Sequence, residues 1–126
     1  MYRCALVVVA AVSICAPAVA QVARQFPQTA LRGEMVVTAP PEVALNGKPA
    51  RLSPGARIRA EDNMLRLSAS LVGRKMVVHY TVDPNGQLAD VWILRPDEIA
   101  RQPWPVTPQQ AATWGFDPIA QVWTEP

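Results

Sequence analysis

Few side chains in this sequence are of a type that could carry out chemistry, and His79 is the first to consider. It is the only histidine of the chain, and a histidine can act as a general base or bind a metal. A zinc site needs several histidine or cysteine ligands, and both cysteines, Cys4 and Cys15, lie among the first twenty residues. We therefore expect His79 to be a structural strand residue at the margin of a sheet, and we predict no metal site.

Two pairs of neighbouring carboxylates, Glu61/Asp62 and Asp97/Glu98, are the remaining candidates for acid–base catalysis. A hydrolase needs two carboxylates at a defined separation across a substrate, and neighbours in sequence do not provide it. The Gly-x-Ser-x-Gly, Gly-x-Gly-x-x-Gly and P-loop patterns are absent from the sequence. We predict that the protein is not an enzyme and has no catalytic residues and no cofactor.

Arginines form the first candidate binding surface. Arg57, Arg59 and Arg66 fall in two neighbouring predicted strands, where the first two share a face and the third may be placed across from them. Such a cluster could bind an acidic partner or an anionic polymer. The alternative is an ordinary solvated face, which we favour because exposed arginines are common.

Tryptophans form the second candidate surface. Trp104, Trp114 and Trp123 crowd the last twenty-three residues together with Phe116. Aromatic residues among prolines can form a ligand platform, but large rings more often fill the core of a small domain that has no disulfide. We favour the core and expect Trp92 to be its firmest member. Trp104 lies between two prolines, and we expect it to be the most exposed of the four tryptophans.

The first twenty residues have the pattern of a signal peptide. Arg3 provides the positive charge, residues 5–14 are apolar, and Ala18-Val19-Ala20 is a cleavage motif. The apolar run is too short to span a bilayer, so we expect export to the periplasm or beyond, with cleavage near Ala20 and no membrane span in the mature chain.

The mature chain would contain no cysteine and almost no net charge. Cleavage leaves 106 of the 126 residues, with 11 basic and 10 acidic side chains once Arg3 is lost. This length suits one domain, and this balance predicts no attraction to nucleic acid.

Residues 75–94 predict a long β-hairpin around which the fold is organised. Two runs rich in β-branched and aromatic residues flank Asp83-Pro84-Asn85-Gly86, a turn in which Gly86 takes a positive φ. Both faces of the hairpin are apolar, so it should lie in the middle of a sheet. The turn predicts these cross-strand pairs: Val82 with Leu88, Tyr80 with Asp90, Val78 with Trp92, and Met76 with Leu94.

Shorter elements surround this hairpin. We expect a strand over residues 34–38, a hairpin over 43–52 with an Asn46-Gly47 turn, a turn at 53–55, and paired strands at 57–59 and 64–67. Residues 95–101 predict one helical turn, and residues 107–114 predict a helix with Thr107 as N-cap. Residues 116–123 read as an extended piece.

These elements predict a mainly β fold: a small antiparallel sheet or partly closed barrel of about five to seven short strands, with one or two short C-terminal helices. Residues 21–33 would be a mobile lead-in. Residues 34–126 would form a single β-rich domain, whose segment from residue 95 is rich in proline and tryptophan.

Two resemblances add to this interpretation. The stretches FPQTALRGEMVVTAPP, LNG, RLSPGARIR, VDPNG, DVWIL and WGFDP resemble a family of small uncharacterised exported proteins of Gram-negative bacteria, which implies periplasmic residence.

Residues 76–118 also resemble, more weakly, the C-terminal domain of TonB-type energy transducers. The shared features are a V-x-Y-x-V-D-x-x-G hairpin and the stretch ATWGFDP. That resemblance implies binding of a partner's peptide by strand addition. The helix before Trp114 is short for that family, and residues 32–71 have no counterpart in it.

The combined expectation is an exported, non-enzymatic β domain with a role in binding or envelope assembly. The alternative is a peptide-binding module that acts by strand addition, and a hydrolase is the least supported class. The expected partner is a periplasmic protein or peptide.

Overall fold

The computed structural model describes residues 23–126, and the predicted signal peptide, residues 1–20, lies outside the described residues. The fold is mainly β, as the sequence predicts. Six strands form the main sheet: β1 (Leu31–Ala39), β2 (Glu42–Leu45), β3 (Lys48–Arg59), β4 (Leu65–Arg66), β5 (Lys75–Val82) and β6 (Leu88–Ile93). A 3₁₀ turn, Ser68–Leu71, connects β4 to β5.

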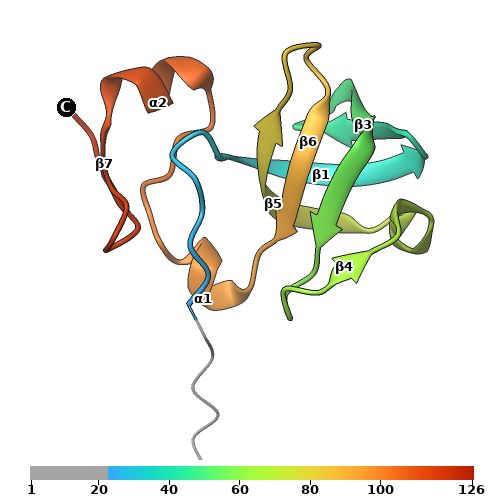
Figure 1. Ribbon diagram of the computed structural model, residues 1–126, viewed down its shortest axis with the longest axis horizontal. Coiled ribbons are helices and arrows are strands. Elements are labelled where there is room, and N and C mark those ends of the chain that lie inside the picture. The colour runs from blue at the N-terminus through green and yellow to red at the C-terminus, as the bar shows by residue number, and fades with distance from the viewer. Residues whose placement is uncertain (1–22) are drawn as a thin grey trace, which may run out of the picture.

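The sheet is mixed, and its strand order is β2-β1-β5-β6-β3-β4 (Figure 1). The predicted hairpin β5–β6 therefore lies in the middle of the sheet, as expected. Strand β2 also pairs with the first part of β3, so the sheet curls back on itself without becoming a closed barrel. All other strand pairs of this sheet are antiparallel, as predicted, and the one exception is β3 with β6, which run parallel. Sequence pattern alone does not show which non-consecutive strands become neighbours.

The pairing register of β5 and β6 differs from the prediction by one residue. Val82 pairs with Leu88 as predicted, but an irregularity next to that pair places Trp92 opposite His79 instead of Val78. Because side chains alternate along a strand, a shift of one residue moves a side chain to the other face of the sheet. Trp92 therefore lies on the face opposite to Val78.

The first part of the sheet contains one confirmed turn and one wrong prediction. Asn46 and Gly47 both have positive φ, 53° and 77°, in the tight turn between β2 and β3, as a two-residue hairpin requires. The turn predicted at residues 53–55 is instead part of the continuous strand β3, whose register against β6 is irregular between Leu52 and Arg57.

Four short elements follow the sheet: α1 (Pro96–Ile99), α2 (Pro108–Thr113), β7 (Gly115–Asp117) and β8 (Val122–Thr124). The side chain of Thr107 accepts a hydrogen bond from the backbone N–H of Gln110, which confirms the predicted N-cap. Residues 116–123, predicted to be one extended segment, instead form most of a hairpin in which β7 pairs with β8. Within residues 23–126, neither helix has the length and apolar character needed to cross a membrane.

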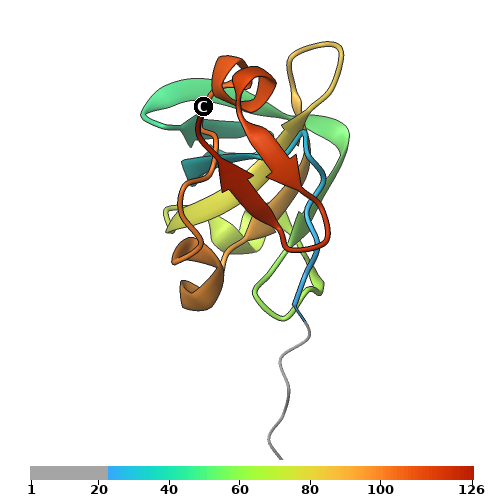
Figure 2. The ribbon, with the colours of Figure 1, turned by 90° about the vertical axis from the view of Figure 1, so that its left-hand side faces the viewer.

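The side chains form two hydrophobic clusters on opposite faces of the central hairpin. The aliphatic cluster lies inside the curl of the sheet and includes Met35, Val37, Val78, Val91 and Ile93. The buried members of the aromatic cluster are Phe26, Ala30, Leu94, Trp104 and Trp123. Trp104 lies between α1 and α2 and Trp123 lies in β8, and these C-terminal elements lie in front of the sheet in Figure 2.

The chain before β1 belongs to this packed structure. Arg24, Phe26 and Ala30 are buried, and the segment passes between the C-terminal elements and the sheet (Figure 1). Leu31 is already the first residue of β1. The predicted boundary at residue 34, with a mobile lead-in over 21–33, was therefore placed too far along the chain. Single apolar residues in a polar segment carry no periodic signal that would have revealed this packing.

Candidate ligand-binding groove

A groove with a volume of about 700 Å³ opens between β8 and the extended segment 102–106. Pro103, Trp104 and Val106 line one side, and Trp123 and Thr124 of β8 line the other. A smaller cavity of about 140 Å³ continues the groove along β8, beside residues 121–123. In Figure 2 the two walls lie side by side on the face turned to the viewer.

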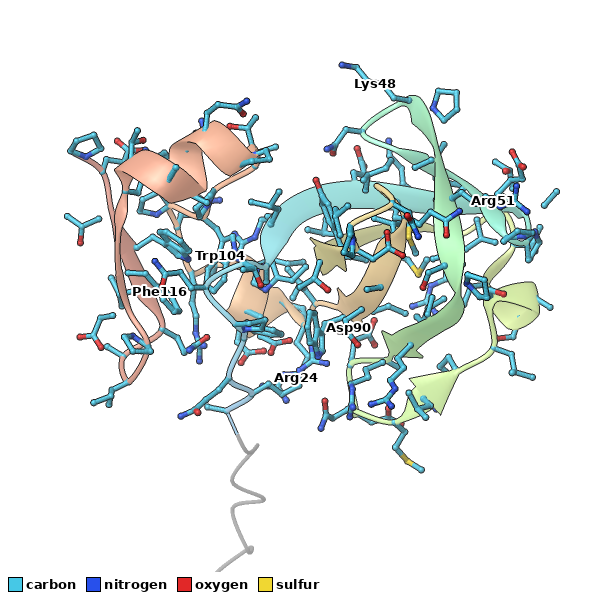
Figure 3. The ribbon with its side chains drawn as sticks, turned by 45° about the horizontal axis from the view of Figure 1, so that its top comes forward. Arg24, Lys48, Arg51, Asp90, Trp104 and Phe116 are labelled. Carbon is cyan, nitrogen blue, oxygen red and sulfur yellow. The ribbon has the colours of Figure 1, made fainter. Side chains whose placement is uncertain are left out.

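The extended segment is held in place by two hydrogen bonds to the start of β1. The backbone N–H of Arg32 donates to the carbonyl of Pro105 at 2.9 Å, and the indole Nε1 of Trp104 donates to the carbonyl of Ala30 at 3.0 Å. Trp104 is also surrounded by other aromatic rings, and Figure 3 shows it beside Phe116, between the sheet and the C-terminal hairpin. This wall of the groove is therefore fixed to the core.

The opposite wall is a strand edge. Strand β8 pairs with β7 on one side, and within residues 23–126 no strand pairs with its other side. Both cavities are lined by β8 and by the segment 100–106, whereas no residue of β7 lines either of them. The unpaired edge of β8 therefore faces the groove, and its backbone N–H and C=O groups are available for pairing.

The side chain of Arg32 extends from β1 into the wall of the groove and gives that wall a positive charge. Its guanidinium donates to Nε2 of His79 at 3.2 Å and to the backbone carbonyls of Ile99 and Glu98 at 3.0 and 2.9 Å. It also lies over the Trp104 ring, with Cζ 5.6 Å from the ring centroid. Burial lowers the pKa of Arg32, and the negative charge of Glu98 partly opposes that effect.

His79 lies behind Arg32 in the middle of the sheet, not at its margin as we expected. Its ring is 1% exposed and stacks on Trp104 at 4.1 Å between centroids. Burial, together with the positive charges of Arg32, Arg24 and Arg101, lowers the pKa of His79 to about 2. Its Nε2 accepts a hydrogen bond, so the neutral ring carries its proton on Nδ1, which has no partner among the described residues. A neutral buried ring in this position is a structural acceptor for Arg32.

Glu98 is also structural. Its carboxylate is fully buried and forms an ion pair with Arg24 of the N-terminal segment. It accepts a further hydrogen bond from the backbone N–H of Arg95 at 2.9 Å. The other predicted pair, Glu61 and Asp62, lies at the surface, where these residues pair with Arg74 and Arg66.

The predicted tryptophans occupy two kinds of position. Trp104 and Trp123 are buried core residues, 5% and 2% exposed, and Trp114 is half-buried against the same cluster. The predicted ranking was wrong, because Trp104 is a central core residue while Trp92 is only partly buried. The hydrogen bond from Trp104 to Ala30 and the one from Arg32 to the neighbouring Pro105 account for the position of Trp104, and neither is visible in the local sequence.

The predicted arginines do not form one surface. Arg57 and Arg59 share a face of β3, but Arg66 pairs with Ile58 and therefore lies on the opposite face. Arg66 is also in an ion pair with Asp62 at 2.7 Å. This part of the prediction was wrong because the β3–β4 register differs by one residue from the arrangement that would align all three.

Sequence reasoning missed Arg24 and Arg32, which lie over the rings of Phe26 and Trp104 in the aromatic cluster, and it considered Glu98 only as part of a catalytic pair. Arg32 lies directly opposite His79 in the β1–β5 pairing, forty-seven positions away in the chain. The one available signal was the alternating pattern of residues 31–37, which would have extended the first strand back to Arg32.

Residues 23–126 contain no group of three or more histidine, cysteine or acidic side chains that could hold a metal ion.

Comparison of the chain with protein-family models, curated proteins and solved structures gives no match.

Proposed function

We propose that this protein is an exported, non-enzymatic binding domain that takes an extended peptide segment of a periplasmic partner into the groove along β8. The signal-peptide pattern of residues 1–20 supports export. The observation that carries the proposal is the unpaired edge of β8, which faces a groove of about 700 Å³. A peptide that adds a strand gains main-chain hydrogen bonds from such an edge, and pockets for alternate side chains provide specificity.

Two further features favour a binding role over catalysis. Pro103, Trp104, Val106 and Trp123 give the groove apolar and aromatic walls, and Arg32 and Glu125 are its charged residues. Apolar walls with a few polar groups are typical of binding sites. The titratable groups behind the groove already have structural partners. His79 is neutral and accepts a hydrogen bond from Arg32, and Glu98 pairs with Arg24. The weak resemblance of residues 76–118 to TonB-type domains is consistent with strand addition.

A second strand edge is the competing location for the same function. Strand β4 is at the border of the main sheet, and Met64, Leu65 and Leu67 around it are exposed. Exposed apolar residues at a sheet edge can also attract a partner strand. We place the site at β8 because that edge has a groove with two walls.

Selection from a phage-displayed library of random octapeptides tests the proposal. Val106 lines the groove and is 45% exposed, whereas Val72 is 52% exposed and lines neither cavity along β8. Wild-type protein and the Val72→Trp variant should select and bind the same peptides. The Val106→Trp variant should bind them at least about tenfold more weakly, since the added ring fills the groove.

Two results would overturn the proposal. One is that the wild-type protein enriches no peptide. The other is that Val106→Trp leaves binding intact while Leu65→Asp at the β4 edge abolishes it, which would move the site to the other strand.

A further inference from the structure

Arg32 has hydrogen-bonding capacity that the fold does not use. A guanidinium has five N–H donors, and three of them bind His79, Ile99 and Glu98. Within residues 23–126, no acceptor is bonded to the other two. All three acceptors are neutral groups, so none of them offsets the positive charge.

The charge balance around the groove points the same way. Arg24 and Arg95 both have carboxylate partners, Glu98 for the first and Asp97 with Glu98 for the second. In the described part of the chain, no carboxylate lies within 4.0 Å of Arg32, and Glu125, which also lines the groove, is farther away than that. Arg101 also has no such partner there, but it lines the smaller cavity and not the main groove. Burial removes water from the guanidinium of Arg32 and so disfavours its charged form. An anion that binds there would stabilise the charge through a charge-assisted hydrogen bond.

We propose that Arg32 is the specificity residue of the groove, and that it binds the carboxylate of an aspartate or glutamate side chain within the added peptide strand. This inference rests on the proposed function. Each terminal nitrogen of the guanidinium keeps one unused N–H, which can donate a charge-assisted hydrogen bond to a carboxylate. Stacking on Trp104 holds it in place, and the apolar walls can pack against the methylene groups of the acidic side chain.

The shape of the groove favours an internal acidic residue over a C-terminal carboxylate. Both cavities share Gln102, Pro103 and Trp123, so the groove continues along β8 past the position of Arg32. A bound strand that entered from the Val106 end and terminated at Arg32 would leave the smaller cavity empty. An internal residue lets the strand occupy both.

The test uses a selected octapeptide with one glutamate or aspartate, its amide counterpart (Glu→Gln or Asp→Asn), and a version with an amidated C-terminus, measured by fluorescence anisotropy. On wild-type protein the side-chain amide should weaken binding about tenfold or more, because a charged hydrogen bond is lost. On Arg32→Gln the acidic and amide peptides should bind equally. Arg51→Gln, at an exposed arginine far from the groove (Figure 3), should behave like wild type.

Each outcome separates this inference from the proposed function. If Val106→Trp blocks binding but the side-chain amide changes the affinity less than about twofold, the groove binds peptide and the inference is wrong. If only C-terminal amidation weakens binding, Arg32 recognises a terminus and the inference is also wrong. If no peptide binds, the proposed function fails and takes the inference with it. If Arg32→Gln does not fold, the Arg101→Gln variant decides the matter, because Arg101 lines the smaller cavity: the amide effect should persist on that variant, and its loss there would contradict the assignment to Arg32.

Discussion

The two hydrophobic clusters, one on each face of the β5–β6 hairpin, are built in different ways. The aliphatic cluster comes almost entirely from strands of one curled sheet, joined by Leu71 of the 3₁₀ turn. Along β1 its members alternate with more exposed residues. The aromatic cluster is assembled from separate segments, among them the N-terminal segment, the loop at 104 and strand β8. It also encloses polar groups, with the ion pair of Arg24 and Glu98 and the neutral ring of His79 buried near it.

This difference explains where a binding site can form. The strands around the aliphatic cluster pair with one another in a single sheet, which leaves the two-residue strand β4 as its edge. The aromatic cluster must bring segments together by specific hydrogen bonds and ion pairs. Its outermost strand, β8, belongs to a separate two-stranded sheet and has an unpaired edge beside the groove.

Trp104→Ala should have the largest effect on stability. Trp104 contacts Phe26, His79, Phe116 and Trp123 and donates a hydrogen bond to Ala30. Its removal should lower the free energy of unfolding by about 3–5 kcal/mol, as large aromatic truncations in cores do. Urea denaturation gives the value.

The half-buried Trp114 provides the control for that measurement. Trp114→Ala should lower the free energy of unfolding clearly less, because part of that ring is already in contact with water. Equal effects at the two positions would show that Trp104 is not the centre of the aromatic cluster.

Glu98→Gln should be the next most damaging change. It leaves the charge of Arg24 buried without its ion-pair partner, and breaking a buried pair in this way lowers the free energy of unfolding by about 3 kcal/mol or more. The exposed neighbour gives a matched control, since Asp97→Asn removes only a surface pair with Arg95 and should change it by less than about 1 kcal/mol.

A double variant tests the cause of that effect. Arg24→Met combined with Glu98→Leu removes both charges and should recover most of the lost stability. If the double variant is as unstable as Glu98→Gln, the buried charge of Arg24 is not the source of the damage.

His79 should make stability depend on pH below its ordinary pKa. The folded protein holds this ring neutral with a pKa of about 2, so only the unfolded chain takes up a proton between pH 6.5 and that value. The contribution is fully present above pH 6.5 and is lost as pH falls, by about 2 kcal/mol at pH 5.0. Denaturation of wild type and His79→Gln at several pH values measures it.

Because His79 is the only histidine of the chain, the comparison is direct. The free energy of unfolding of His79→Gln should change less between pH 7 and pH 5 than that of wild type. Parallel curves for the two proteins would mean that the ring is open to protonation in the folded state.

The smallest predicted effect lies in the turn of the central hairpin, beside the aliphatic cluster. Gly86 has a φ of 79° with open space around it, so an added Cβ is strained by backbone conformation and not by a clash. Gly86→Ala should lower the free energy of unfolding by about 1 kcal/mol. Gly55 is equally uncrowded but has no positive φ, so Gly55→Ala should have no such penalty; equal losses would contradict this account of the turn.

The parts of the fold that follow from local chemistry could be predicted. The Asn46-Gly47 turn, the Thr107 N-cap and the central position of the β5–β6 hairpin depend on residues close together in the chain. Positive φ, capping and alternation act over a few residues, and the sequence displays them directly.

The candidate site could not be predicted in the same way. One irregular pairing next to Val82 reversed the face of Trp92, and no sequence signal marks it. Arg32 meets His79 and Pro105 only after distant segments have packed. Groups that act together through long-range pairing leave no spacing pattern in the chain.

Backbone amide hydrogen exchange, with and without the tightest-binding octapeptide from the library, tests strand addition along β8 most directly. The edge of β8 that faces the groove is unpaired among the described residues, so its outward amides should exchange quickly in the free protein. Binding should slow exchange within residues 122–125 by about tenfold or more, as new main-chain hydrogen bonds form, and leave β4 unchanged. Slowed exchange at Leu65–Arg66 with none at β8 would contradict the account.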